Sequence, residues 1–215
     1  MNYTTIYLIR HSIRFDQSVI EEYKTSQSEL LKSEKIILSV EGEERAKKLA
    51  ELEELKNIDK VYASNCVRTL QTAKYLLKDQ NLKVTLDERF DERRVGIPNS
   101  DEYPNWFELQ YLDENYKTIG GESQKDVRER FEEAFKEAVD NNKHKRIAIF
   151  AHGYAITFFL MKWLKLLNVT RDKKLTFEYK GNIFYDKILD APEIFKLVID
   201  DDYNVIELEN LVVEY

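Results

Sequence analysis

The chain has 215 residues, of which 43% are hydrophobic and 34% are charged, and its formal net charge is −7. This length is enough for one sizeable core, so we expect a single domain over residues 1–215, and the hydrophobic content excludes a disordered chain. Acidic and basic residues are interleaved along the sequence. That distribution argues against nucleic acid or an anionic membrane as the main partner.

A membrane span and a disulfide framework are also disfavoured. The longest apolar run, Ala155 to Leu167, is short and carries Lys162 and Lys165, so it predicts a packed helix. Strand-like sequence begins at once, and we therefore expect no secretory signal. The single cysteine, Cys66, cannot form an intramolecular disulfide, makes a structural zinc site unfavourable and fits a reducing, cytoplasmic location.

Strands and helices alternate in the first part of the chain. Short apolar runs predict buried strands, and apolar residues at helical spacing predict amphipathic helices. The expected elements are a strand over Thr4–Ile9, a loop from Arg14 to Lys35, a helix from Val40 to Glu54 capped by Ser39, a strand over Val61–Ala63, a helix with Val67 and Leu77 on its apolar side, and a strand over Lys83–Leu86.

The second part begins with a long segment, Asp87 to Gly121, that has little periodicity and predicts a loop. The expected elements that follow are a helix from a capping box at Ser123 through Ala138, a strand over 147–151, a helix from about Tyr154, and strands over Leu175–Tyr179, Ile194–Ile199 and Val205–Leu208, the last two as a hairpin. The order predicts a three-layer α/β/α fold with a mostly parallel central sheet and an antiparallel addition from the C-terminal tail.

Two histidines follow the clearest predicted strands. His11 comes after the first strand with Arg10 beside it, and His152 follows the strand at 147–151. Ligands of open α/β sheets bind at the carboxyl ends of the strands, so both histidines are expected in one crevice. Such a crevice suits chemistry on an anion, above all a phosphoryl group.

Phosphoryl transfer to a side chain needs a nucleophile, cations for the phosphoryl oxygens and an acid for the leaving oxygen. Neutral imidazole at His11 has the lone pair, and the planar fork of Arg10 donates bidentately to phosphate. Arg68 starts the helix after the second strand, and Glu92 lies in the long loop. Taken alone, each of these residues is more often an ordinary surface or core residue.

The order of the motifs is more specific than any one of them. Five motifs follow one another in the chain: Arg10-His11 after the first strand, Arg68 before Gln71-Thr72-Ala73, Glu92-Arg93-Arg94 with Gly96, Gly121-Glu122-Ser123 before a helix, and Ala151-His152-Gly153 after a late strand. This series resembles the histidine phosphatase superfamily, in its phosphoglycerate-mutase-like branch, over roughly residues 4 to 165.

The resemblance implies a role for each matching residue. His11 is expected to be the nucleophile that becomes phosphohistidine, with Arg10 and Arg68 clamping the phosphate. His152 is expected to donate a hydrogen bond to the phosphoryl oxygens. Glu92 is expected to protonate the leaving oxygen and then activate water. No metal or organic cofactor is implied, and the expected partner is a small phosphorylated substrate.

The residues after His11 depart from the usual pattern. Ser12 stands where the family usually has glycine, so its hydroxyl either donates to the phosphate or narrows the pocket. Gln17 is expected to replace an asparagine that helps to bind phosphate. Arg14 matches a third phosphate ligand of the acid-phosphatase branch, and the alternative is a solvated loop arginine.

We therefore expect a metal-independent phosphatase of small phosphomonoesters. The short segment between Glu92 and Gly121 favours hydrolysis over the first alternative, a phosphoglycerate mutase, which must hold its intermediate away from water. A second alternative is a weakly active module that binds a phosphorylated ligand. Strand-like sequence at 205–215 is a candidate homodimer edge, and the alternative is an edge that the chain itself covers.

Other residues carry weaker expectations. Aromatic residues of the loop either line one wall of the site or pack the loop onto the domain; they are Tyr103, Trp106, Phe107, Tyr111 and Tyr116. The acids Asp91, Asp101 and Glu102 disfavour a highly anionic substrate, and Arg93 and Arg94 oppose them. The expected roles are a solvated loop for His144, packing for Cys66, a helix cap for Ser123 and a pocket wall for Gly121-Glu122.

Overall fold

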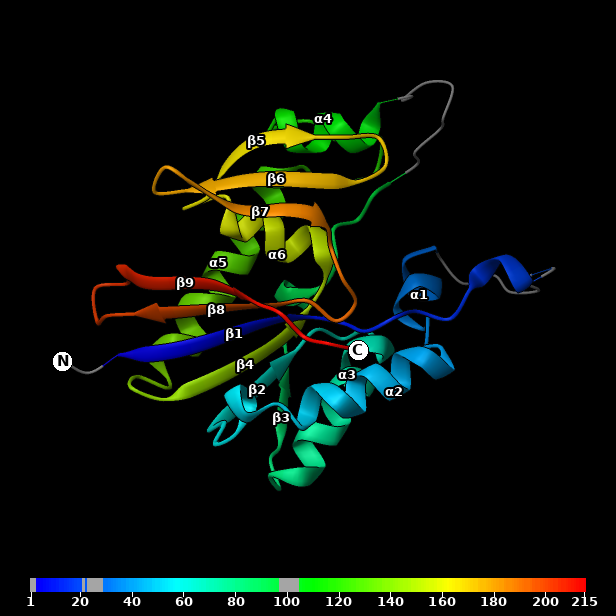
Figure 1. Ribbon diagram of the computed structural model, residues 1–215. Helices are drawn as coiled ribbons and strands as arrows, with labels where there is room; N and C mark the ends of the chain where they lie inside the picture. The colour runs from blue at the N-terminus through cyan, green and yellow to red at the C-terminus, as the bar shows by residue number, and fades with distance from the viewer. Residues whose placement is uncertain (1–2, 21, 23–28, 97–104) are drawn as a thin grey trace.

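A six-stranded sheet runs through the centre of the molecule (Figure 1). The computed structural model describes residues 3–20, 22, 29–96 and 105–215. The strand order is β3 (Val84–Leu86), β2 (Lys60–Ala63), β4 (Arg146–Ala151), β1 (Thr4–Arg10), β8 (Ile194–Ile199) and β9 (Val205–Leu211). The first four strands are parallel, whereas β8 and β9 are antiparallel to their neighbours. The predicted mostly parallel sheet with an antiparallel addition from the tail is confirmed.

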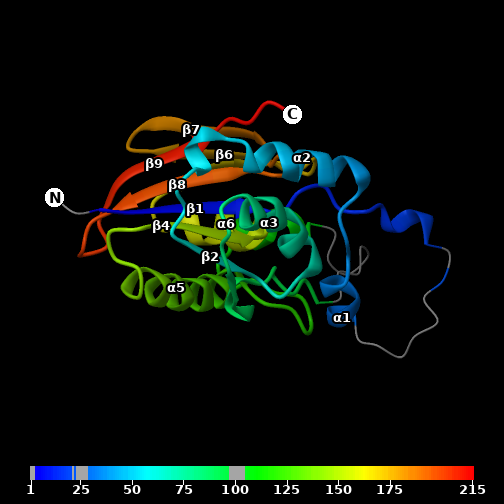
Figure 2. The ribbon, with the colours of Figure 1, turned by 90° about the horizontal axis from the view of Figure 1, so that it is seen from below.

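Helices cover both faces of this sheet, as the two sides of Figure 2 show. On one face lie α2 (Val40–Ala50) and α3 (Val67–Asp79), and on the other lie α5 (Gln124–Asp140) and α6 (Gly153–Leu160). Side chains of β1 alternate between these faces: Ile6 and Leu8 join the cluster with α5 and α6, and Tyr7 and Ile9 join the opposite one. The expected three-layer α/β/α fold is confirmed.

The predicted caps start two of these helices. The Ser39 hydroxyl accepts from the backbone N–H of Gly42, and Ser123 forms the capping box with Asp126. Gly42 has a second reason to be glycine, because a β-carbon there would lie 2.1 Å from the carbonyl oxygen of Ile13. α2 ends at Ala50 rather than at Glu54, because extended backbone at Leu52 begins a 3-10 turn over Glu53–Leu55.

A second, three-stranded antiparallel sheet lies beside the first and was only partly predicted. Its order is β5 (Lys165–Val169), β6 (Lys174–Tyr179) and β7 (Asn182–Ile188). The expected helix over Ala155 to Leu167 is wrong beyond Leu160: the chain turns, and from Lys165 onward it pairs with β6. β7 was not predicted, because its apolar residues do not alternate with polar ones: Ile183, Phe184 and Tyr185 are consecutive.

The segment expected to be a loop contains a helix, α4 (Trp106–Leu112), which packs against β5. Its buried residues, Phe107, Gln110 and Tyr111, follow helical spacing, but the glutamine interrupts the apolar pattern. The remaining short elements are α1 (Glu29–Glu34) and 3-10 turns at Gln17–Val19 and Glu88–Phe90. In the described part of the chain, no helix has both the length and the apolar character needed to cross a bilayer.

Candidate active site

Two buried histidines meet at the carboxyl edge of the parallel strands. His11 follows β1 and His152 follows β4, and these strands are neighbours in parallel register. The ring centroids are 5.2 Å apart, and the residues are 4% and 0% exposed. The structure therefore brings together two residues separated by most of the chain, as the sequence predicted.

The hydrogen bond of His11 defines its tautomer. Nδ1 lies 2.7 Å from the carbonyl oxygen of Ser12, and a carbonyl only accepts, so Nδ1 carries the proton and Nε2 keeps the lone pair. Burial, with the positive charges of Arg68 and Arg10 next, holds the pKa of His11 well below its usual value. The imidazole is consequently neutral near pH 7, which is the nucleophilic form.

Both ring nitrogens of His152 are engaged with the protein. Nδ1 accepts from Nη2 of Arg68 at 3.1 Å, and Nε2 donates to the Ser64 hydroxyl at 2.7 Å. Burial, followed by the charge of Arg68, also holds the pKa of His152 well below its usual value. Direct donation from His152 to a phosphoryl oxygen therefore requires one of these bonds to open. Ser64 was not predicted as a site residue; its place directly after β2 was the available signal.

Two arginines flank His11, each with an unused donor. Arg10 Nη1 donates to the carbonyl oxygens of Leu189 (2.6 Å) and Asp190 (2.8 Å), and Arg68 Nη1 donates to the Ser33 carbonyl (2.7 Å). Nε of each arginine is buried and has no hydrogen-bond partner among the described residues. A bound anion would satisfy both donors.

Gly153 gives Arg10 its place. A β-carbon at Gly153 would lie 3.3 Å from Nε of Arg10, which is tighter than most packing contacts. The glycine after His152 therefore leaves room for the arginine before His11. This contact links two motifs that lie at opposite ends of the resemblance.

Ser12 is fully buried, and its hydroxyl has no partner among the described residues. Its φ is not positive, so the backbone here does not require glycine. Arg14 lines the cavity next to His11 and is exposed to solvent. Gln17 lies in the 3-10 turn over Gln17–Val19 and is not among the described residues that line the cavity.

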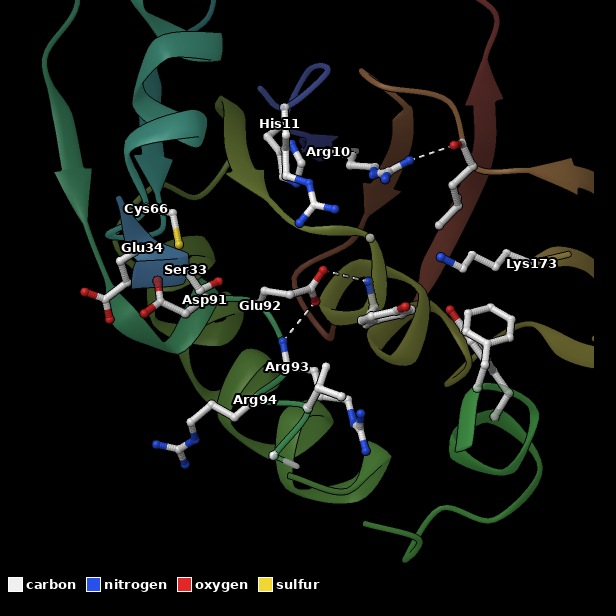
Figure 3. A pocket seen from close by; sticks show the side chains of 18 of the residues that line it. Arg10, His11, Ser33, Glu34, Cys66, Asp91, Glu92, Arg93, Arg94 and Lys173 are labelled. Atoms are coloured by element: carbon white, nitrogen blue, oxygen red, sulfur yellow. Dashed lines mark hydrogen bonds between the residues drawn. The ribbon is translucent and has the colours of Figure 1, made fainter. Parts of the chain in front are cut away.

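Glu92 faces the cavity from the opposite side to His11 (Figure 3). Its carboxylate accepts from the backbone N–H of Arg93 (2.9 Å), Ala155 (3.1 Å) and Tyr154 (3.4 Å), the last two in the first turn of α6. These bonds orient the carboxylate toward the cavity between His11 and Tyr154. A carboxyl group in this position can exchange a proton with the oxygen of a leaving group bound there.

A buried ion pair that sequence reasoning missed supports the Glu92 segment. The Glu122 carboxylate accepts from Arg130 Nε (2.9 Å) and from the Arg94 backbone N–H (2.8 Å). Arg130 Nη1 also donates to the carbonyl oxygens of Arg89 and Asp91. Burial raises the pKa of Glu122, but the hydrogen bond and the charge of Arg130 oppose it, so the pKa lies below its usual value. The predicted wall residue Glu122 thus positions Glu92.

One cavity of about 670 Å³ joins these groups. One end is polar and includes Arg10, His11 and Glu92. The other end is formed largely by apolar and aromatic side chains from α4, α6 and the second sheet, namely Phe107, Tyr111, Tyr154, Leu175, Ile188 and Leu189. We call these the phosphate end and the leaving-group end.

Of the predicted loop aromatics, Phe107 and Tyr111 line the cavity, whereas Trp106 packs against Phe107 and Tyr154. Tyr116 is outside the cavity lining, and Tyr103, Asp101 and Glu102 lie outside the described residues. Asp91 also lines the cavity, and burial raises its pKa to about 6.

A single group of potential metal ligands occurs among the described residues: ligand atoms of Cys66, Asp91 and His152 lie within 4.8 Å of one another. Burial raises the pKa of the Cys66 thiol to about 11, so the thiol stays protonated near pH 7. The neighbouring Arg68 guanidinium repels a cation. This group does not fit a resident metal. The remaining histidine, His144, is half-exposed and lies 2.8 Å from Asp201.

The family profile of the histidine phosphatase superfamily (branch 1) matches residues 6–176 of this chain. The chain therefore belongs to that superfamily, as the resemblance of its motifs indicated. A search among curated proteins gave no match.

Solved structures agree on the fold. A mycobacterial glucosyl-3-phosphoglycerate phosphatase matches with a TM-score of 0.71 at 19% identity, covering 98% of each chain. YhfR of Bacillus stearothermophilus matches at 0.69 and 20% identity, covering 94% of this chain and 95% of the other. The alpha-ribazole phosphatase of Shigella flexneri matches at 0.64 and 16% identity, covering 98% and 100%. At such identities the likeness shows the fold alone.

Proposed function

We propose that this protein is a phosphatase that hydrolyses phosphomonoesters through a phosphohistidine on His11. The observation that carries the proposal is the state of His11: a buried, neutral imidazole whose Nδ1 proton is held by the Ser12 carbonyl, so that Nε2 offers its lone pair. The positive charges of Arg10 and Arg68 help to lower the pKa of His11, and Nε of each arginine is a donor without a partner among the described residues. Membership of the superfamily agrees with this chemistry.

In the first proposed step, Nε2 of His11 forms a bond to phosphorus while the bond from phosphorus to the ester oxygen breaks. Protonated Glu92 gives its proton to that oxygen, which leaves as the alcohol. Arg10 and Arg68 neutralise the charge on the equatorial oxygens, and exposed Arg14 contributes a third positive charge. Gln17 lies outside this arrangement.

In the second proposed step, the Glu92 carboxylate takes a proton from water, and the water oxygen attacks phosphorus. The bond to His11 breaks, and inorganic phosphate leaves. His152 acts on this site through Arg68, because its Nδ1 accepts from the guanidinium that would hold the phosphate. No metal or cofactor takes part in either step.

The test is hydrolysis of p-nitrophenyl phosphate at pH 5 to 8, with EDTA present, by the wild type and His11→Ala. The half-exposed His144 supplies the matched control, His144→Ala. We expect turnover in the wild type and the control and none in His11→Ala. Undiminished turnover in His11→Ala would overturn the mechanism. An assay with phosphoglycerate, primed with bisphosphoglycerate, separates a phosphatase from a mutase, since only a mutase interconverts the isomers.

A further inference from the structure

The leaving-group end of the cavity is mainly apolar and carries positive charge at two residues. Its walls come from α4, α6 and the second sheet and are apolar or aromatic, and the whole cavity of about 670 Å³ is in the size range of sites for drug-sized ligands. Small polar alcohols would leave most of this apolar surface in contact with water. The walls therefore favour a bulky, mainly apolar leaving group.

The exposed cation is Lys173, which lines the same end, and the buried cation is Arg93, which lines the cavity near Tyr154. Lys173 lies in the turn between β5 and β6, and in Figure 3 its ammonium extends toward the centre of the cavity. Its φ is +71°, in the left-handed region that favours glycine. Lys180 shares this backbone conformation, so the feature that distinguishes Lys173 is the direction of its ammonium group, toward the cavity.

Lys173 also differs from neighbouring cations in its pairing. Lys174 pairs with Asp186 at 2.9 Å, Lys187 with Asp190 at 2.8 Å, and Arg171 with Glu108 at 3.3 Å. Lys173, like Lys165 and Lys180 of the same sheet, has no acidic partner among the described residues, and of these three lysines it is Lys173 that lines the cavity.

Three acids line the cavity. Glu34 and Asp91 lie near Cys66, across the cavity from Lys173 in Figure 3, and Glu92 lies between His11 and Tyr154, where the leaving oxygen would bind. Among the described residues, no acid of the second sheet lines the cavity, so an anionic group at the far side of the leaving group would meet Lys173.

We propose that the substrate is a phosphomonoester of a bulky apolar or aromatic alcohol that carries a carboxylate, and that Lys173 binds this carboxylate. The inference rests on the proposed function for the position of the phosphate. It adds that the second sheet and α4 select the leaving group by apolar contact with its body and by one charge at its far side.

Binding of three non-hydrolysable phosphonates, measured by calorimetry, tests this inference without requiring turnover. The probes are methylphosphonate, 4-propylbenzylphosphonate and 4-(2-carboxyethyl)benzylphosphonate. We expect the propylbenzyl compound to bind at least about tenfold more tightly than the methyl compound, because it buries apolar surface. We expect the carboxylate to add about threefold, the size of a solvent-accessible ion pair.

The variants are Lys173→Gln and a matched control, Lys180→Gln. Lys180 also has a positive φ in a turn of the second sheet, but it does not line the cavity. The carboxylate increment should disappear in Lys173→Gln and persist in Lys180→Gln. The inference is overturned if the propyl compound binds no better than the methyl compound, if the carboxylate adds nothing in the wild type, or if its increment survives in Lys173→Gln.

Hydrolysis of p-nitrophenyl phosphate is measured in a separate assay. Turnover of p-nitrophenyl phosphate without any preference among the phosphonates would refute the inference and leave the proposed function standing. A clear preference for the carboxylated phosphonate without turnover of p-nitrophenyl phosphate would support the inference and refute the proposed function. If none of the three phosphonates binds, the leaving-group site itself is refuted.

Discussion

The two ends of the cavity differ in how they are built. The phosphate end lies at the carboxyl edge of parallel strands, where β1, β2 and β4 deliver His11, Ser64 and His152 to one place. The leaving-group end is assembled mainly from α4 and the second sheet, with Tyr154 of α6 beside them. The groups proposed to carry out the chemistry are thus separated from the surface proposed to select the substrate, and we expect that each can be altered without the other.

At the phosphate end, replacement of Arg68 should have the largest effect on activity. Because its guanidinium is proposed to bear the phosphoryl charge, Arg68→Met should lower kcat/KM about 10²- to 10³-fold for alkyl and aryl esters alike. The surface arginine Arg128, which pairs with Glu114, provides the control Arg128→Met. Steady-state kinetics on both classes of ester measure this effect. If kcat/KM fell for only one class of ester, Arg68 would act on the leaving group rather than on the phosphoryl group.

A smaller effect is expected from Ser12, whose buried hydroxyl has no partner among the described residues. If phosphate supplies that partner, Ser12→Ala should lower phosphate affinity about tenfold, the loss of one charge-assisted hydrogen bond. Competitive inhibition by inorganic phosphate measures the affinity. Tighter inhibition in Ser12→Ala would instead mean that the side chain narrows the pocket.

At the leaving-group end, replacement of Ile188 should lower kcat/KM for a bulky ester and not for a small one. Ile188 lines the cavity, whereas Ile183 on the same strand does not, and both side chains are exposed to a similar degree. Ile188→Ala should reduce kcat/KM for naphthyl phosphate about threefold and leave ethyl phosphate unchanged. Ile183→Ala should change neither. Equal losses on both esters in Ile188→Ala would contradict the division into two ends.

The smallest expected effect concerns stability and pH. The pKa of buried His152 lies well below its usual value, so below about pH 6.5 the unfolded chain binds a proton that the folded protein does not. Stability from neutral His152 is therefore present above that pH and is lost as the pH falls.

Thermal unfolding at pH 7 and pH 5, in phosphate-free buffer, measures this contribution. The drop in Tm should be smaller in His152→Asn than in the wild type. An equal drop in both proteins would show that His152 does not contribute.

The same two ends explain what the sequence could and could not predict. Residues of the phosphate end follow strands whose apolar runs are unambiguous, so His11 and His152 were placed from local sequence. Parallel order then brought them together.

The leaving-group end depends on elements with weak local patterns. In α4, Gln110 interrupts the apolar stripe, and the run after Leu160 was taken for helix although it pairs as β5. Lys173 lies in the turn after β5, and no local pattern could direct its side chain to a cavity formed with α4 and α6. Such contacts depend on tertiary pairing that single segments do not encode.

The central claim is that His11 carries the phosphoryl group, and Glu92→Gln tests it most directly. p-Nitrophenol leaves without help from an acid, so the first step should proceed in this variant. Water activation needs the missing carboxylate, and the phosphoenzyme should accumulate. The measurement is an alkaline quench during turnover of p-nitrophenyl phosphate, followed by mass spectrometry of the peptides. We predict a phosphoryl group on His11; its appearance on another residue would contradict the account.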